Sequence, residues 1–147
     1  MRLDHAALMI SDPEAARAFY VGVLGLEEVS RPPTFTFPGL WLAIGDRQLH
    51  LIGEAESGRT RETNPGYRSE ELETGYSSHF AILVDDLLGY LEEVRGRGGE
   101  VVGGPRPRGD GILQAYLTDP DGNVVELMQT GVEVTGDEPE IGTPKTG

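Results

Sequence analysis

The sequence predicts an α+β fold in which two βαβββ modules pair into an eight-stranded curved sheet, like two half-barrels around a central hollow. Two observations support this prediction. Short segments alternate apolar and polar residues as strands do, and an amphipathic helix follows the first strand in each half of the chain. The whole order of elements then occurs twice. Because one module cannot bury its own sheet face, the two are expected to pair.

The first module spans residues 1–53. Residues 3–10 alternate as a strand, with His5, Ala7 and Met9 on one face. A helix is expected over 11–25, because Asp12 suits an N-cap, Pro13 its first position and Gly25 its end. Further strands are predicted in three segments, the last of which contains a turn at Gly45 and Asp46: 26–30, 34–37 and 40–53.

The second module, residues 76–130, repeats this order. A strand over 78–86 places His79, Ala81 and Leu83 on one face. An amphipathic helix over 86–99 ends at paired glycines, which also argues against a phosphate-binding loop there, since such a loop precedes its helix. Three more strands are predicted, with a hairpin turn at residues 119–122 before the last: 100–104, 112–119 and 123–130.

Two segments lie outside the modules. Residues 54–75 are polar, carry mixed charges and lack a clear period, which is typical of a surface linker and compatible with a lid over the hollow. Residues 131–147 are polar and rich in Gly, Pro and acidic side chains. We expect this acidic tail to be disordered.

Composition excludes several classes of function. The net charge of -13 opposes binding to nucleic acid and to anionic membranes. The absence of cysteine excludes disulfides, zinc fingers, iron–sulfur centres and a cysteine nucleophile. The first ten residues resemble neither a signal peptide nor a membrane span, so a cytoplasmic protein is expected.

Polar residues occupy matching strand positions in the two modules. Alignment of the modules places His5 on His79 and His50 on Glu126, and strand alternation turns all four away from the helix-packed faces. An ionised glutamate on an otherwise apolar face costs several kcal/mol unless a charge or a metal compensates it. Three imidazoles and one carboxylate suit a divalent first-row metal, so we predict a metal site in the hollow.

Two stretches resemble the vicinal oxygen chelate superfamily, which includes glyoxalase I, extradiol dioxygenases and bleomycin-binding proteins: LDHAALMISDPEAARAFYVGVLGLE at the start and AYLTDPDGNVVELMQ at the end. The resemblance covers residues 3–130 and implies ligands at His5, His50, His79 and Glu126. Glyoxalase I typically has a glutamate at the position of His50, and this departure argues against glutathione-dependent glyoxalase activity. Bleomycin-binding members usually lack the metal residues, which disfavours pure drug binding.

The resemblance implies a metal-dependent enzyme that acts on a small substrate with vicinal oxygens, as a lyase, an isomerase or a group transferase. Glu126 and His50 are the candidate catalytic residues, and the ion is zinc, nickel, iron or manganese. One alternative is an extradiol-type dioxygenase, with His5, His79 and Glu126 as its facial triad. Another is a small-molecule binding protein without turnover.

Other residues carry weaker signals. Arg108 can contact an anionic substrate, and Trp41 and Tyr116 are candidates for substrate binding, although an arginine in a solvated loop and aromatic rings in the core are the more ordinary interpretations. We expect a homodimer, because a second chain would cover exposed sheet edges.

Overall fold

A computed structural model describes residues 1–64 and 66–144. The chain divides into two compact units: residues 1–65 with the turn Asp119–Asn123, and residues 66–118 with 124–147. Parts of the predicted linker and tail, residue 65 and residues 145–147, lie outside the described residues. No helix of the described ranges is long and apolar enough to cross a membrane.

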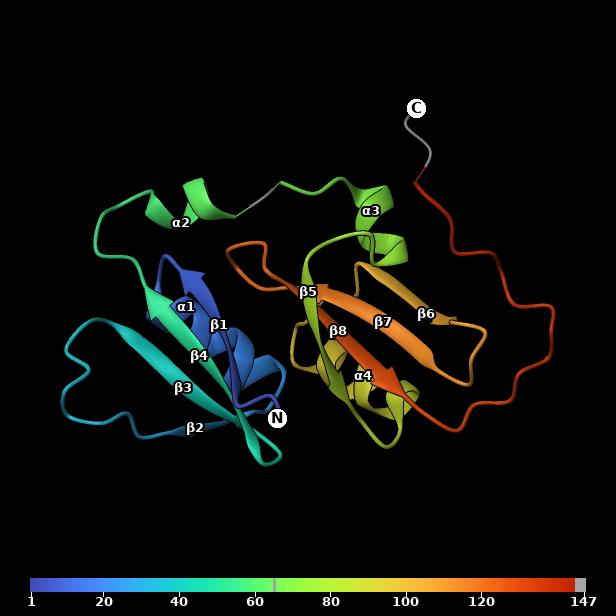
Figure 1. Cartoon of the computed structure of the whole chain (residues 1–147), viewed down its shortest axis with the longest axis horizontal. Coiled ribbons are helices and arrows are strands. Elements are labelled where there is room, and N and C mark those ends of the chain that lie inside the picture. The colour runs from blue at the N-terminus through green and yellow to red at the C-terminus, as the bar shows by residue number, and fades with distance from the viewer. Residues whose placement is uncertain (65, 145–147) are drawn as a thin grey trace. The chain divides into compact units, whose positions relative to one another are not determined.

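The first unit contains a four-stranded sheet in the order β1-β4-β3-β2 (Figure 1). Its strands are β1 (His5–Ile10), β2 (Glu27–Val29), β3 (Gly39–Ile44) and β4 (Arg47–Gly53). Strands β1 and β4 are parallel, whereas the other neighbours are antiparallel. The helix after β1 starts as α1 (Pro13–Arg17), which Asp12 caps as predicted, and continues as the π-helix η1 (Ala18–Val23).

The second unit repeats this topology in the order β5-β8-β7-β6. Its strands are β5 (His79–Leu83), β6 (Gly103–Pro107), β7 (Leu113–Thr118) and β8 (Val124–Gln129), and its long helix is α4 (Leu87–Gly96). Strands β5 and β8 are parallel. The two predicted βαβββ modules are therefore confirmed, and their eight strands form two four-stranded sheets.

Each sheet has one face buried beneath its helix. In the first unit this face is apolar and close to fully buried, together with the helix residues that cover it: Ile10, Ala16, Tyr20, Leu24, Leu40, Leu42, Leu49 and Leu51. In the second unit Leu87, Leu91 and Val94 of α4 are buried with Val125 and Leu127 of β8. Burying one such side chain contributes about 1.5–3 kcal/mol. We call the opposite side of each sheet its open face.

The strand registers repeat between the units. His50 lies between Ala7 of β1 and Trp41 of β3, while Glu126 lies between Ala81 of β5 and Tyr116 of β7. Paired residues of neighbouring strands share a face, so His50 and Glu126 both lie on open faces. The predicted assignment of faces is confirmed.

One predicted strand is wrong. Residues 34–37 form no strand, because Pro32, Pro33 and Pro38 flank them and a proline cannot donate to a strand ladder. The backbone N–H of Phe35 instead donates to the carbonyl of Pro32 at 2.9 Å, which makes a turn. The strand predicted over 100–104 begins later, as β6 at Gly103.

The linker contains two short helices that periodicity did not predict, α2 (Arg59–Thr63) and α3 (Ser69–Thr74). Helix α2 contacts β1 in the first unit, and α3 contacts β6 in the second. Residues 131–144 of the tail form neither helix nor strand.

Candidate active site

The first unit brings two histidines together on its open face. His5 on β1 and His50 on β4 stack with their ring centroids 4.0 Å apart. The indole of Trp41 stacks on the other side of His50 at 3.9 Å, with the two rings nearly parallel. His50 therefore lies between two rings, and this packing fixes the plane of its imidazole.

Hydrogen bonds assign the protons on these two rings. The Nδ1 of His5 donates to Asp4 Oδ2 at 2.8 Å, and the Nε2 of His50 donates to Gln48 Oε1 at 2.8 Å. Because both oxygens are acceptors, a neutral ring carries its lone pair on Nε2 in His5 and on Nδ1 in His50. Burial and the neighbouring His5 lower the pKa of His50, which favours the neutral ring that a metal requires.

The second unit brings His79 and Glu126 together. The Nε2 of His79 lies 2.9 Å from Glu126 Oε2, and the Nδ1 of His79 donates to the carbonyl of Ser77 at 2.8 Å. The hydrogen bond to Glu126 raises the pKa of His79. Glu126 is only 4% exposed, and its Oε1 is buried with no hydrogen-bond partner among the described residues.

Tyr116 occupies the position in the second unit that Trp41 occupies in the first. Its ring meets His79 edge to face, with centroids 5.6 Å apart. Burial, followed by the charge of Glu126, raises the pKa of the Tyr116 hydroxyl to about 12, so the group stays protonated. A Cβ atom at Gly75 would clash with this hydroxyl, so the segment after α3 packs directly on Tyr116.

Arg108 is occupied within its own loop. Its guanidinium makes a bidentate ion pair with Asp110, at 2.8 Å for Nη2 and 3.1 Å for Nε, and this pairing raises the pKa of Arg108. The two charged side chains of the Arg-Gly-Asp tripeptide are thus paired with each other.

The predicted ligands thus occur as two pairs, His5 with His50 and His79 with Glu126. Within residues 1–64 and 66–144, no group of three or more His, Asp or Glu side chains is gathered as a metal site. Sequence reasoning missed the partners of the histidines, Asp4, Gln48 and Ser77. Gln48 could have been predicted as the partner of His50, because the two are two residues apart on one strand and therefore share a face.

Comparison with known proteins identifies the family. The profile of the Glyoxalase/Bleomycin resistance protein/Dioxygenase superfamily matches residues 2–127. The chain belongs to this superfamily. The predicted resemblance to the glyoxalase superfamily is therefore confirmed.

Curated relatives of this glyoxalase-superfamily chain include lactoylglutathione lyases. The chain is 30% identical over 133 residues to Lactoylglutathione lyase GLX1 of Arabidopsis thaliana, a match that covers 88% of this chain and 44% of that protein. It therefore spans less than half the length of this plant relative. It is also 29% identical to the lactoylglutathione lyase of Salmonella typhimurium, a match that covers 88% of this chain and 93% of that protein.

Solved structures of the superfamily share the fold. A lactoylglutathione lyase from Agrobacterium tumefaciens is 26% identical, with a TM-score of 0.62 over 87% of this chain and 92% of its own. The antibiotic binding protein TnmS3 from Streptomyces is also 26% identical, with a TM-score of 0.66 over 88% of this chain and 96% of its own. Relatives on this fold thus carry the names of both enzymes and binding proteins.

Proposed function

We propose that the chain is a metal-dependent enzyme of the glyoxalase superfamily that acts on a small substrate with two neighbouring oxygens. The expected reaction is a non-redox one, as in a lyase, an isomerase or a group transferase. Membership of the superfamily and relatives named lactoylglutathione lyase support an enzyme of lyase type. The chemistry of the open faces supports the metal.

The burial of Glu126 is the observation that carries this proposal. A buried carboxylate costs several kcal/mol unless each oxygen has a compensating partner. His79 compensates Oε2 at 2.9 Å, whereas Oε1 lacks a hydrogen-bond partner in the described part of the chain. An oxygen with this environment fits a group that binds a cation or accepts a proton.

The donors present fit a divalent first-row metal. We propose that His5, His50, His79 and Glu126 hold it, because imidazole and carboxylate are the ligands that zinc, nickel, iron and manganese accept. When bound, such an ion supplies Lewis acidity that stabilises negative charge on a substrate oxygen. Asp4, Gln48 and Ser77 orient the three imidazoles through the hydrogen bonds described above.

Residues of the chain itself orient the imidazoles, hold a proton and shape the site. Trp41 stacks on His50 and restricts the ring to one orientation. Glu126 Oε1 is free to hold a proton, and His79 on Oε2 stabilises the charged carboxylate. Tyr116, protonated over the physiological range, adds an apolar wall beside His79.

Binding without turnover is the second candidate function. The resemblance to the antibiotic binding protein TnmS3, at 26% identity, favours it. The extradiol-type dioxygenase is the competing enzyme, since the name of the superfamily includes dioxygenases.

Hydrogen exchange distinguishes these functions. Hydroxyacetone carries two neighbouring oxygens, and a non-redox enzyme of this kind should catalyse its C–H exchange in D2O, measured by proton NMR. We expect metal-dependent exchange at equal rates in air and under nitrogen. Glu126→Gln should reduce the rate by about 100-fold or more, whereas Glu133→Gln, in the exposed tail, should not change it.

Consumption of dioxygen in step with turnover would replace this proposal by the dioxygenase. Tight binding of vicinal-oxygen compounds with no exchange and no other turnover would replace it by the binding protein.

A further inference from the structure

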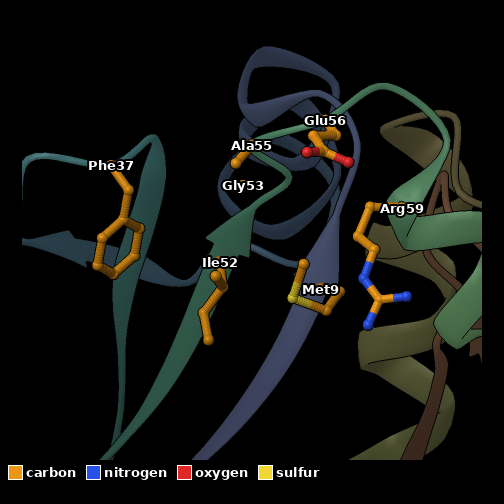
Figure 2. A pocket seen from close by; sticks show the side chains of 7 residues that line it. All are labelled: Met9, Phe37, Ile52, Gly53, Ala55, Glu56 and Arg59. Carbon is orange, nitrogen blue, oxygen red and sulfur yellow. The ribbon is translucent and has the colours of Figure 1, made fainter.

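A pocket of about 440 Å³ lies within the first unit, against the two strands that carry the candidate histidines. Figure 2 shows Met9 and Ile52 projecting from neighbouring strands, with Phe37 on one side and Arg59 on the other. This volume is within the range of small-molecule sites and is large enough for a substituted aromatic ring.

The floor of the pocket is apolar. Met9 of β1 and Ile52 of β4 are paired in the strand register and are only half buried, so their side chains are available for contact. Phe37 remains 39% exposed, which is unusual for a ring of its size. These side chains leave apolar surface uncovered at one place on the open face.

The loop that carries Phe37 is held in place. The backbone N–H of Gly53 donates to the carbonyl of Pro38 at 2.8 Å. A Cβ atom at residue 53 would lie 2.8 Å from both the Cβ and the carbonyl oxygen of Pro38, so a glycine is needed for this approach. The contact fixes the loop against the end of β4, and the wall formed by Phe37 is therefore built into the fold.

The pocket lies beside the candidate histidines on the same open face. Ile52 is two residues beyond His50 on β4, which corresponds to about 7 Å along the strand. Aromatic rings connect the two places, because Phe37 contacts Phe35 at 5.5 Å, Phe35 contacts Trp41 at 5.0 Å, and Trp41 stacks on His50. One small molecule can therefore reach both His50 and the pocket.

Charged side chains line the rim of the pocket. They are Glu56 and Arg59, and the guanidinium of Arg59 is paired with Glu62 at 2.9 Å. The floor formed by Met9 and Ile52 carries no charge, so it suits an uncharged group.

We propose that this pocket binds an apolar group of the substrate, an aromatic ring or a branched alkyl chain attached next to its two oxygens. The inference rests on the proposed function for the oxygens only. The preference for an apolar substituent comes from Met9, Ile52 and Phe37.

Three monoanionic acids test the apolar pocket and the vicinal-oxygen function separately. Mandelate and lactate share a carboxylate with a neighbouring hydroxyl and differ in a phenyl or a methyl group, whereas phenylacetate keeps the phenyl and lacks the hydroxyl. Isothermal titration of the Zn²⁺-supplemented full chain should show that mandelate binds roughly 10- to 30-fold tighter than lactate, because the phenyl buries more apolar area.

Single-residue variants test whether the preference for mandelate over lactate arises in this pocket. Met9→Glu should reduce the mandelate-to-lactate ratio to within about threefold, since it places a charge in the floor. Phe37→Ala should reduce the ratio in the same direction without introducing a charge. Leu83→Glu is the matched control, because Leu83 is the repeat-related position on β5 and is 61% exposed; the ratio should persist there.

Equal affinity for mandelate and lactate in the wild type, or a ratio that survives Met9→Glu and Phe37→Ala, would overturn the pocket assignment. So would a loss of equal size in Leu83→Glu, or an absence of binding by both aromatic acids. Phenylacetate that binds as tightly as mandelate would instead count against the vicinal-oxygen function and leave the pocket standing.

Discussion

The three candidate histidines differ in the ring nitrogen that is hydrogen-bonded to the residue orienting them. An aspartate, a glutamine and a backbone carbonyl each accept a hydrogen bond from one ring nitrogen. The other nitrogen is Nε2 in His5, Nδ1 in His50, and Nε2 in His79, where it lies 2.9 Å from Glu126 Oε2. Fixing the tautomer before an ion arrives removes a cost from binding. Metal affinity should therefore depend on residues that do not touch the metal.

Gln48 allows this dependence of metal affinity on a supporting residue to be tested. Gln48→Leu removes the acceptor for His50 Nε2–H and should weaken metal affinity about 10-fold or more. Long-range nitrogen–proton NMR of the metal-free protein should show His50 changing from one tautomer to a mixture. Gln48→Glu retains an acceptor oxygen and should restore the single tautomer. An unchanged His50 spectrum in Gln48→Leu would show that Gln48 does not fix the ring.

The turn between β7 and β8 shows how an element is held by one buried group. Asp119 is 5% exposed and accepts hydrogen bonds from the hydroxyl of Tyr20 on η1 and from the amide of Asn123, both at 2.8 Å. Burial raises the pKa of Asp119, although these hydrogen bonds oppose the shift. The turn thus groups with the first unit while its strands belong to the second.

Tyr20→Phe should lower the free energy of unfolding by about 1–3 kcal/mol, because it leaves a buried carboxylate short of a donor. Urea denaturation measures the loss. Tyr76→Phe removes a hydroxyl from a side chain that is 58% exposed, and should leave the stability unchanged. Equal stability of the two variants would mean that the Tyr20 hydroxyl contributes nothing to the fold.

Few residues of the described part of the tail are packed against the rest of the chain. Most side chains of 131–144 are exposed, although the N–H of Val132 donates to Gly111 at 3.0 Å and Arg106 reaches the carbonyl of Glu140 at 3.3 Å. Deleting residues 133–147 should leave melting temperature and metal content nearly unchanged. A decrease of about 5 °C or more, which corresponds to more than about 1 kcal/mol, would show that the tail is docked.

Elements with strong local patterns were predictable. Alternation located β1, β4, β5, β7 and β8, and α4 was marked by its apolar stripe and terminal glycines. The segment 34–37 alternated equally well but failed, because its prolines leave it without the donors of a ladder. Helices α2 and α3 were missed because each has six residues or fewer, too short to show a period.

The candidate site was predictable as far as strand faces could define it. Alternation placed His5, His50, His79 and Glu126 on open faces, and the registers confirm those faces. The stacking of His5 on His50 and the burial of Glu126 depend on tertiary packing, which no local pattern records. The apolar pocket was missed for the same reason, since its walls come from segments far apart in sequence.

For the whole molecule, the repeat is the organising feature. Each unit supplies one pair of donors from matching strands, and neither pair alone gives the three or four protein ligands that a divalent first-row metal commonly requires. Both pairs therefore belong to the ligand set proposed above. A variant in either pair should lose the metal while the fold survives, because the apolar residues that hold each helix to its sheet lie on the opposite face.

Metal analysis of the purified protein tests this proposal most directly. Inductively coupled plasma mass spectrometry of the wild type should find a divalent metal in stoichiometric amount, and His79→Ala and Glu126→Ala should each retain less than about a tenth of it. Circular dichroism should show that both variants stay folded. Undiminished metal in both folded variants would contradict the proposed site.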